Sequence, residues 1–466
     1  MIGQKRALLI QPPLEDFYTT PIRLYPLGLL YTARVLQIYG WEVKILDSLS
    51  PLRKKRISLP EKFAYLQPYL NHPYFFKNYY RFGLNKEKII SIVKEYSPDL
   101  IGLSCSFAAY YKSVDELANE IKKNFSTCLI VGGNQASCLP EEIKKRTPTI
   151  DAIIVGPAEI SLPLFLRNNF PQDGLKKTVQ SHRPDEILLE ASESIDWKKI
   201  WPAHELVKPH LYRIGQRNYA SLQASRGCPF QCTFCNVHLV FGRQFECRPI
   251  ESLLQEMKYL YRHHQVRIFN FEDDNLSLNR EWFKEFLKTV KKDSELKEIE
   301  LLAMNGLSYD TLDEELLSLM KTAGFRQLDL PLVSGQEELR RKLKRPERKG
   351  GEYFWEIIRL AKKLGYFITV YLIIGLPGQT KAEIIETASR LWQEKILVSP
   401  SIFYLAPGSE IDQTLTISEE VKNDWDKYRS TAFALETEEL SRDDLISLFL
   451  YLRQKNLEFH LLKKRN

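Results

Sequence analysis

The sequence has no long apolar segment and few cysteines. No apolar run approaches the roughly 20 residues of a membrane-spanning helix. Ala7–Ile10 is the only apolar run among the first 17 residues, and it is too short for a signal-peptide core. Seven cysteines in 466 residues are too sparse for a disulfide framework. We therefore expect a cytoplasmic protein whose length allows two or three domains.

The overall composition is ordinary, with a moderate excess of positive charge. Hydrophobic residues make up 44% and charged residues 27%, and the formal net charge is +7. Basic residues are densest at positions 340–349, with a shorter run at positions 53–56. Such runs are commonly solvated faces, although they also suit an anionic partner. Because no RNA-binding module pattern accompanies them, we do not expect a nucleic acid partner.

Three cysteines stand close together at Cys228, Cys232 and Cys235, directly after Ser225-Arg226-Gly227. Iron–sulfur clusters are held by cysteine thiolates, normally four of them. Three local thiolates would leave one iron of a cubane cluster open to a small molecule. A small zinc site is the alternative, and His238 could complete it. The run at 220–225 reads as a strand, which places this loop at the carboxyl end of a strand.

Residues 1–165 alternate short β-rich runs with helical stretches, which predicts a parallel sheet covered by helices on both faces. The expected strands are Ala7–Ile10, Val43–Asp47, Leu100–Ser104, Leu129–Val131 and Ala152–Val155. The expected helices are Leu27–Tyr39, Lys86–Tyr96, Val114–Asn124 and Pro140–Arg146. Ligands of such sheets bind outside the carboxyl ends of the strands.

Small and polar residues follow these expected strands. Glycine lets the backbone approach a ligand closely, and short hydroxyl side chains supply hydrogen bonds. The candidate ligand-binding residues of this half are Pro13, Gly28, Ser104, Ser106, Gly132, Gly133, Asn134, Gln135, Gly156 and Glu159.

A second series of strands and helices extends from about residue 218 to 408. The expected strands are Ala220–Ser225, Val266–Phe271, Ile299–Ala303, Gln327–Leu332, Phe367–Ile374 and Ile396–Tyr404. Six such units predict a partial (β/α)6 barrel, whose active-site residues sit at the carboxyl ends of the strands. The stretches at those ends are Glu272-Asp273-Asp274-Asn275, Val333-Ser334-Gly335 and Gly375-Leu376-Pro377-Gly378. Acidic strand ends also serve as helix caps, so each stretch alone is a weak signal.

The fold class is therefore α/β, with a Rossmann-like parallel-sheet domain at 1–165 and a TIM-type partial barrel at 216–410. A linker spans 166–215, and a helical region spans 411–466, with expected helices at Ile417–Tyr428 and Asp443–Leu462. An insertion at 51–85 holds nine aromatic residues between Phe63 and Phe82. It suits packing between domains, a wall beside a flat cofactor, or a lid over an apolar substrate.

The cysteine loop and the barrel strand ends resemble the radical SAM enzymes. The resemblance implies that the three cysteines hold a [4Fe–4S] cluster and that S-adenosylmethionine chelates its open iron. One electron then cleaves S-adenosylmethionine and yields a 5′-deoxyadenosyl radical. The residues that the resemblance places around S-adenosylmethionine are Phe234, Asp273, Ser334, Gly335 and Gly375. Val333 stands where the family usually has Glu.

The N-terminal loops resemble the cobalamin (B12)-binding domain that precedes the barrel in many radical SAM enzymes. The resemblance implies that the candidate residues of the N-terminal half contact cobalamin. No D-x-H-x-x-G follows the first strand, so no histidine is offered to the lower face of the cobalt. Gln135 stands where the family often has His. The alternative is a flavodoxin-like domain that has lost its ligand.

The resemblance as a whole implies a cobalamin-dependent radical SAM methyltransferase that uses methylcobalamin to methylate an unactivated carbon. Related enzymes without methyl transfer, such as porphyrin ring cyclases, are an alternative. The substrate would be a small molecule, of apolar or aromatic character if the insertion lies over it. An external electron donor such as flavodoxin or ferredoxin is implied.

Two further functions are disfavoured. A methylthiotransferase carries a second cluster in its N-terminal domain, and Cys105 and Cys138 could contribute to one. However, Gln11-Pro12-Pro13 stands where such an enzyme has a cysteine after its first strand. We expect the cysteines outside the loop to be buried structural residues. A cobalamin sensor without catalysis would not need the cysteine loop.

Overall fold

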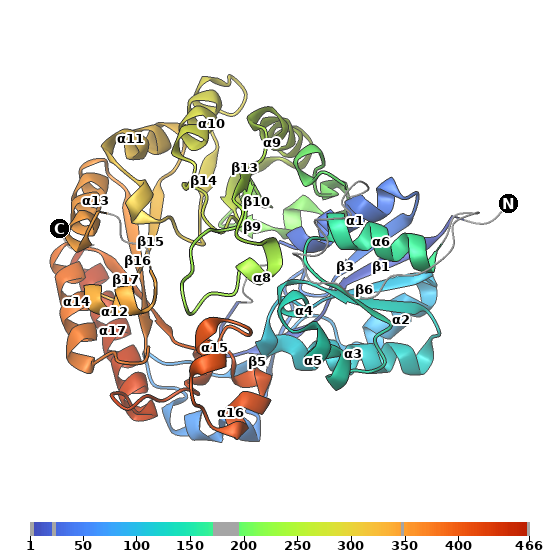
Figure 1. Ribbon diagram of the computed structural model, residues 1–466, viewed down its shortest axis with the longest axis horizontal. Coiled ribbons are helices and arrows are strands. Elements are labelled where there is room, and N and C mark those ends of the chain that lie inside the picture. Colours follow the sequence, from blue (N-terminus) through green and yellow to red (C-terminus); the bar gives the residue numbers. More distant parts are fainter. Residues whose placement is uncertain (1–3, 21–24, 171–194, 346–348, 464–466) are drawn as a thin grey trace.

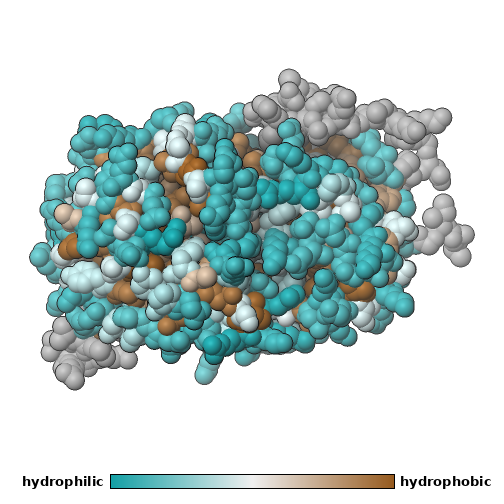
Figure 2. Space-filling model, turned by 90° about the horizontal axis from the view of Figure 1, so that it is seen from below, coloured by the Kyte–Doolittle hydropathy of each residue, from teal (hydrophilic) through white to brown (hydrophobic). Residues whose placement is uncertain are grey.

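The computed structural model describes residues 4–20, 25–170, 195–345 and 349–463. An N-terminal α/β lobe lies beside a larger crescent of strands and helices, and the C-terminal segments return between the two (Figure 1). Within the described residues, no helix is long and apolar enough to cross a bilayer. Hydrophilic residues cover most of the face in Figure 2, and hydrophobic residues appear there in small groups.

The N-terminal lobe is built on a parallel five-stranded sheet in the order β3-β1-β6-β7-β8. The strands are β1 (Arg6–Gln11), β3 (Glu42–Asp47), β6 (Leu100–Ser104), β7 (Cys128–Gly132) and β8 (Ala152–Ile154). All five expected strands are confirmed, within a residue at most ends. The strand order reverses between β1 and β6, and ligands of such sheets bind in the crevice that opens there.

Helices cover both faces of this sheet, as expected. Leu9 packs in one apolar cluster with α1 (Leu27–Ile38) and α6 (Ala158–Asn169). Its neighbour Leu8 packs in the other, with α2 (Lys86–Tyr96), α3 (Tyr111–Asn124) and α5 (Pro140–Arg146). Because both faces are buried, these strands are continuous apolar runs rather than alternating ones. Helix α6 runs to Asn169, across the boundary expected at residue 165.

The insertion forms a small antiparallel sheet beside the main one. Its strands are β4 (Lys54–Ile57) and β5 (Tyr79–Phe82), which pair in the order β2-β5-β4 with β2 (Leu14–Asp16). A 3₁₀ helix at Glu61–Tyr69 lies between them. The aromatic side chains pack against the C-terminal region, with ring centroids 5.5 Å apart for Phe75–Phe433 and 5.6 Å for Phe76–Phe449. The insertion therefore packs between two parts of the fold.

The crescent consists of two sheets. One has the order β14-β13-β10-β9 and the other the order β15-β16-β17. The strands are β9 (Arg213–Ile214), β10 (Arg217–Leu222), β13 (Val266–Phe271), β14 (Glu300–Leu302), β15 (Gln327–Val333), β16 (Phe367–Ile374) and β17 (Leu397–Ile402). A single bridge, Leu301 to Phe325, lies beside the gap between the sheets. The described strands thus form the expected open barrel, and Figure 1 shows helices along its outer side.

Each outer helix returns the chain from the carboxyl end of one strand to the start of the next. These helices are α9 (Ile250–His264), α10 (Arg280–Lys292), α11 (Glu314–Ala323), α13 (Gly351–Lys363) and α14 (Lys381–Gln393). Helix α17 (Arg442–Lys463) contacts β17 and α14, and so covers the free edge of the crescent. This helix confirms the one expected at 443–462.

The helix expected at Ile417–Tyr428 is wrong as a single element. The structure has a short helix α16 (Glu419–Asn423) and a separate 3₁₀ turn at Trp425–Lys427. The side chain of Asp424 accepts a hydrogen bond from the backbone N–H of Asp426 at 3.2 Å. Asp424 therefore caps a new turn instead of continuing the helix, since a short acidic side chain competes for backbone donors.

Candidate functional site

The three clustered cysteines lie on the loop between β11 (Ser225–Arg226) and α8 (His238–Phe241). Cys228 and Cys232 are buried, and Cys235 is half-buried. Burial raises the pKa of Cys228, and it raises the pKa of Cys235 to about 11. Neither thiol therefore ionises readily alone, whereas bound metal would stabilise the thiolates.

Backbone hydrogen bonds fix this loop to the barrel. Thr233, between two of the cysteines, donates its N–H to the carbonyl of Leu343 at 3.1 Å. The carbonyl of Thr233 accepts from the N–H of Ile411 at 3.0 Å. The loop also depends on Gly227, whose φ is +79° and where a side chain would overlap the carbonyl of Gln244. The loop is thus held on both sides before any cofactor binds.

The cysteines suit a cluster better than a single zinc ion. Across the described ranges, no three His, Cys, Asp or Glu side chains converge closely enough to hold one metal ion. A zinc site needs four ligands around one point, whereas the thiolates of a cubane bind different irons and stand further apart. His238, the candidate fourth zinc ligand, is the first residue of α8.

The acidic stretch after β13 lies directly behind the cysteine loop. Asp273 is buried and accepts hydrogen bonds from the Ser225 hydroxyl at 2.5 Å, from the Ser225 N–H and from the Ala224 N–H at 3.1 Å. Burial raises its pKa to about 7, although these hydrogen bonds act in the opposite direction. Asp273 therefore supports the strand that leads into the cluster loop.

Asn275, two residues further on, lies beside the first cysteine. Its side-chain hydrogen bond to Cys228 acts against the burial that raises the pKa of that thiol. Its buried Oδ1 has no hydrogen-bond partner within the described part of the chain. An unsatisfied buried oxygen is costly, so it is available for a donor group of a bound ligand.

Other residues of the chain pack closely around Ser334, Gly335 and Gly375. The hydroxyl of Ser334 donates to Glu383, and its carbonyl accepts from Arg340 at 2.8 Å. A side chain at Gly335 would overlap the hydroxyl of Thr387. Gly375 has a φ of +90°, and a Cβ there would lie 2.9 Å from Leu445 of α17. A direct contact of each with S-adenosylmethionine remains a prediction.

The loops at the carboxyl ends of β6 and β7 are joined by backbone hydrogen bonds. Cys105 donates its N–H to Gly132 at 2.7 Å, and its carbonyl accepts from Gln135 at 3.1 Å. Gly133 has a φ of +121°, and a Cβ there would lie 2.7 Å from the carbonyl oxygen of Cys105. Loop packing therefore requires glycine at position 133, whereas a Cβ at Gly132 would make only ordinary contacts. The hydroxyls of Ser104 and Ser106 are 3.4 Å apart in the same loop.

Two observations test whether these loops suit cobalamin, and both are consistent with a bound ligand. Gln135 is only 3% exposed, yet its Nε2 has no hydrogen-bond partner among the described residues. A Cβ at the exposed Gly28, at the start of α1, would meet nothing within 4 Å. A buried donor without an acceptor and open space beside a helix start are features that a large polar ligand would fill.

The N-terminal loops and the cysteine loop face each other. Helix α4 (Asn134–Cys138), which follows the Gly-Gly pair, packs against α8. Asn236 donates to the sulfur of Cys138 at 3.3 Å and to the carbonyl of Pro407 at 3.0 Å. A Cβ at Gly156 would lie 3.6 Å from the carbonyl of Val240 in α8. The loops that are expected to hold the two cofactors are therefore in direct contact in the fold.

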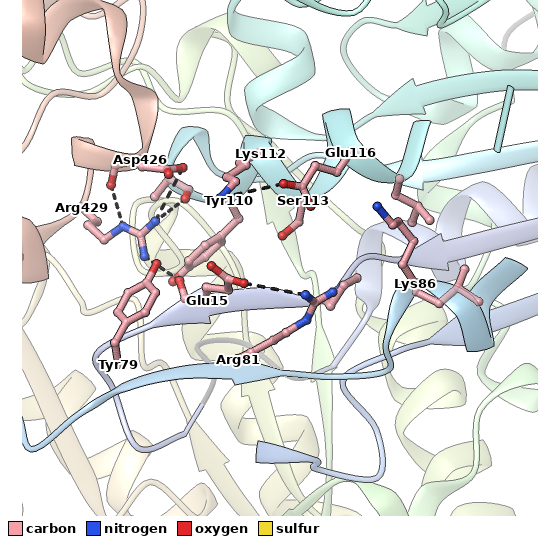
Figure 3. Close-up of a pocket in the computed structure, with 14 residues that line it drawn as sticks. Glu15, Tyr79, Arg81, Lys86, Tyr110, Lys112, Ser113, Glu116, Asp426 and Arg429 are labelled. Atoms are coloured by element: carbon pink, nitrogen blue, oxygen red, sulfur yellow. Dashed lines mark hydrogen bonds and ion pairs between the residues drawn. The ribbon is translucent and has the colours of Figure 1, made fainter. Parts of the chain in front are cut away.

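Glu159 and Pro13 have surroundings that the sequence pattern did not reveal. The carboxylate of Glu159 forms an ion pair with Arg226 at 2.9 Å. Pro13 lies elsewhere, in a polar pocket that is lined by the insertion, α3 and the C-terminal segment (Figure 3). The Arg429 guanidinium donates to the carbonyl of Glu15 in this pocket at 2.6 Å. Contacts of Pro13 and Glu159 with cobalamin remain predictions.

Of the four cysteines outside the loop, only Cys105 is buried as expected, whereas Cys128, Cys138 and Cys247 are half-buried. Cys105 is buried in the main apolar cluster, and burial raises its pKa to about 12. Burial also raises the pKa of Cys138 to about 12.

Comparisons with known proteins agree with this geometry. The model of the radical SAM superfamily matches residues 222–391, and that of the B12-binding domain matches residues 70–166. The chain is 26% identical to cytidylyl-2-hydroxyethylphosphonate methyltransferase from Streptomyces wedmorensis, across 87% of this chain and 81% of that protein. It is 24% identical to anaerobic magnesium-protoporphyrin IX monomethyl ester cyclase from Cereibacter sphaeroides, across 78% and 60% of the two chains.

A solved structure shares the fold. It is the radical S-adenosylmethionine methyltransferase TsrM from Kitasatospora setae, determined with cobalamin and a [4Fe–4S] cluster. The TM-score is 0.61 at 16% identity, across 88% of this chain and 74% of TsrM. The chain therefore contains a radical SAM domain and a B12-binding domain, the pair that cobalamin-dependent radical SAM enzymes combine, and the cofactors of this pair are a [4Fe–4S] cluster, S-adenosylmethionine and cobalamin.

Proposed function

We propose that the protein moves a methyl group from S-adenosylmethionine, by way of cobalamin, to an unactivated carbon of a small organic molecule. The observation that supports this proposal is the packing of α4 against α8, which brings together the loops proposed to hold the two cofactors. The cluster supplies the electron that cleaves S-adenosylmethionine, and cobalamin supplies a carrier for the methyl group. A substrate between the two sites would be within reach of both.

In this proposal, the protein's own residues bind, position and enclose. Cys228, Cys232 and Cys235 ligate iron, and Asp273 holds the strand before them through Ser225. Gln135 offers its unpaired amide N–H to an acceptor on cobalamin. Burial of Cys228 and Cys232 limits the access of water to this side of the cluster, which would protect a reactive intermediate.

The substrate site would lie where the barrel strands end, since active-site residues of such barrels collect at the carboxyl ends. Met304 follows β14 and is 50% exposed, and Tyr404 follows β17 and is 41% exposed. The Tyr371 hydroxyl donates to the carbonyl of Met304 at 3.0 Å and so supports the first of these positions. Large apolar side chains left exposed at strand ends suit an apolar or aromatic substrate.

We also infer that an external donor such as flavodoxin or ferredoxin reduces the cluster from the side of α12 (Glu337–Lys342). The guanidinium of Arg345, just beyond this helix, lies 4.0 Å from the sulfur of Cys232. Leu343 is hydrogen-bonded to the cysteine loop. Basic residues within the run at 340–345 would attract an acidic donor to this surface, which lies close to the cluster loop.

Ring chemistry without methyl transfer is the second candidate, because the cyclase relative covers 78% of this chain. One experiment separates the two without knowledge of the substrate. The protein is reconstituted with iron, sulfide and hydroxocobalamin, desalted, reduced and mixed with S-adenosylmethionine. A methyltransferase should form S-adenosylhomocysteine in a burst of about one per bound cobalt. Formation of 5′-deoxyadenosine without S-adenosylhomocysteine would contradict methyl transfer and favour the second candidate.

A further inference from the structure

Arg226, two residues before the first cluster cysteine, is enclosed within the protein. Only 7% of it is exposed. Its Nη2 donates to the carboxylate of Glu159 at 2.9 Å, and its Nε donates to the side chain of Gln223 at 2.8 Å. Three aromatic rings surround the guanidinium, with centroids at 4.9 Å (Tyr31), 4.3 Å (Trp197) and 5.2 Å (Phe241). These contacts fix the position of the guanidinium.

Glu159, the partner of Arg226, belongs to the opposite lobe. It lies in the first turn of α6, directly after β8, and is only 1% exposed. Three residues earlier, the N–H of Gly156 donates to the hydroxyl of Ser137 at 2.9 Å. Ser137 lies in α4, which follows the Gly-Gly pair. A short path thus joins the expected cobalamin loops to the cluster loop through one buried ion pair.

A second group of buried polar residues extends the connection. Arg248 donates to Glu256 at 2.5 Å and to the carbonyl of Gln223 at 3.3 Å. His204 is hydrogen-bonded to Glu256 at 2.9 Å and to the hydroxyl of Tyr25 at 2.5 Å. All of these side chains are buried. Gln223 joins the two groups, because its side chain contacts Arg226 and its carbonyl contacts Arg248.

Stability alone does not explain such a network. Removing two charges from water is expensive, and apolar residues of similar size often replace a buried ion pair at no net cost. A buried hydrogen bond does fix geometry where it crosses between the lobes, and the Arg226–Glu159 bond would be lost if the lobes shifted. Chemistry that needs two cofactors has a narrow geometric tolerance, since a misplacement of about 1 Å can cost about 100-fold in rate.

We propose that the Arg226–Glu159 pair is a positioning contact that sets the separation between the cluster and cobalamin. The contact spans the two lobes and lies within two residues of a cluster ligand on one side and three residues of Gly156 on the other. The inference rests on both cofactors binding as described above, but it does not depend on whether the reaction is a methylation.

The test compares two variants with the wild-type protein after loading with both cofactors. Arg226→Met combined with Glu159→Leu replaces the ion pair with apolar side chains, so neither charge is left buried alone. Glu159→Asp keeps the charge but shortens the side chain by one methylene. Arg217→Met is the matched control, because Arg217 lies on β10 and pairs with Glu300 near the surface. Iron and cobalt per chain are measured first in each protein.

The main readout is electron paramagnetic resonance of the reduced cluster in the presence of cob(II)alamin. The magnetic interaction between these two centres depends on their separation. We expect it to change in the double variant and, to a smaller extent, in Glu159→Asp, while the control matches the wild type. The cluster signal in cobalamin-free protein should be the same in all four proteins. We also expect several-fold more 5′-deoxyadenosine per product once a substrate is known.

Two failures can be distinguished. Wild-type protein that retains no cobalt would overturn the proposed function at the loading step. An unchanged magnetic interaction in a loaded variant, with either Glu159→Asp or the double variant, would overturn the positioning role. A change in the cluster signal without cobalamin would also overturn it, because the pair would then act on the cluster alone. If the double variant fails to fold, Glu159→Asp alone decides the question.

Discussion

The hydroxyl of Ser225 donates a 2.5 Å hydrogen bond to the buried carboxylate of Asp273. Ser225 lies three residues before the first cluster cysteine, and Asp273 follows the neighbouring strand β13. The acidic stretch after β13 therefore supports the strand that leads into the cluster loop. This role is separate from the contact with S-adenosylmethionine that the sequence predicts. This relationship gives the acidic strand end a structural role that can be measured in the protein without cofactors.

Asp273→Asn should change how thermal stability depends on pH. Burial raises the pKa of Asp273 from 3.8 to about 7, so the folded state binds the proton more tightly than the unfolded state. The associated stabilisation is full below about pH 4 and is lost as pH rises through about 7, at no more than about 1.4 kcal/mol per pH unit. The Tm of wild type should therefore fall relative to that of Asp273→Asn between pH 5 and pH 8.

The comparison uses the difference between the two Tm values at each pH, because other groups titrate in the same range. Burial also raises the pKa of Asp47 to about 6, and both proteins share that contribution. The amide should also lower Tm by a similar amount at every pH, because it weakens the hydrogen bonds from Ser225 and Ala224. Only the slope tests the prediction, and a Tm difference that is constant with pH would contradict it.

Replacing Cys228, Cys232 and Cys235 together with Ala should remove the cluster. We expect iron per chain after reconstitution to fall to background and formation of 5′-deoxyadenosine to stop, because a cubane cluster is held by cysteine thiolates and the triple variant lacks all three proposed ligands. Cys128→Ala is the matched control, since Cys128 is a half-buried cysteine at the start of β7. Iron that stays bound to the triple variant would refute the ligand assignment.

Gly28→Trp should lower the affinity for cobalamin by at least about tenfold, the effect of roughly 1.4 kcal/mol. Gly28 is exposed, and a Cβ there meets nothing within 4 Å, so the folded protein should tolerate the side chain. Absorbance titration with hydroxocobalamin measures the affinity, and iron content shows that the cluster is spared. Gly28→Ala is the control, and equal affinities for Trp and Ala would contradict the placement of cobalamin.

Gly133 is a poor position for the same experiment, although the sequence singles it out equally. A Cβ at Gly133 would lie 2.7 Å from the carbonyl oxygen of Cys105, and its φ of +121° disfavours other residues. Replacement with Trp would distort the loop even without a ligand. Lost cobalt would then have two explanations, so only the structure reveals which of the two glycines gives an interpretable result.

Regular elements were predictable where the sequence has long apolar runs. The strands Val266–Phe271 and Phe367–Ile374 occur with the predicted bounds, because both are rich in the β-branched and aromatic residues that favour strands. The helix expected at Ile417–Tyr428 was not predictable from periodicity, because the capping of a new turn by Asp424 overrides the apolar pattern. Local patterns therefore locate elements but not the short turns between them.

Contacts between the lobes could not be predicted from the sequence for a different reason. Arg226 and Glu159 are 67 residues apart, and neither position carries a local pattern that names its partner. The aromatic insertion gave a stronger signal, because nine rings in 20 residues require a large apolar neighbour. That neighbour includes Phe433 and Phe449, more than 350 residues away in the chain.

Arg341→Glu combined with Lys342→Glu should impair reduction by a protein donor. Both side chains are exposed on α12, whose end is hydrogen-bonded to the cysteine loop through Leu343. Reversing two charges at the rim of an interface slows association and weakens its salt dependence. We expect the KM for reduced flavodoxin to rise by roughly three- to tenfold at low ionic strength, while the rate with dithionite stays unchanged.

Lys362→Glu combined with Lys363→Glu is the matched control, because these lysines lie on α13, on the outer side of the barrel. It makes the same change in net charge, so a general effect of charge would lower the flavodoxin-driven rate equally in both proteins. A selective loss in the α12 variant, removed at high salt, supports docking beside the cluster. An equal loss in both, or a loss with dithionite as well, would place the donor elsewhere.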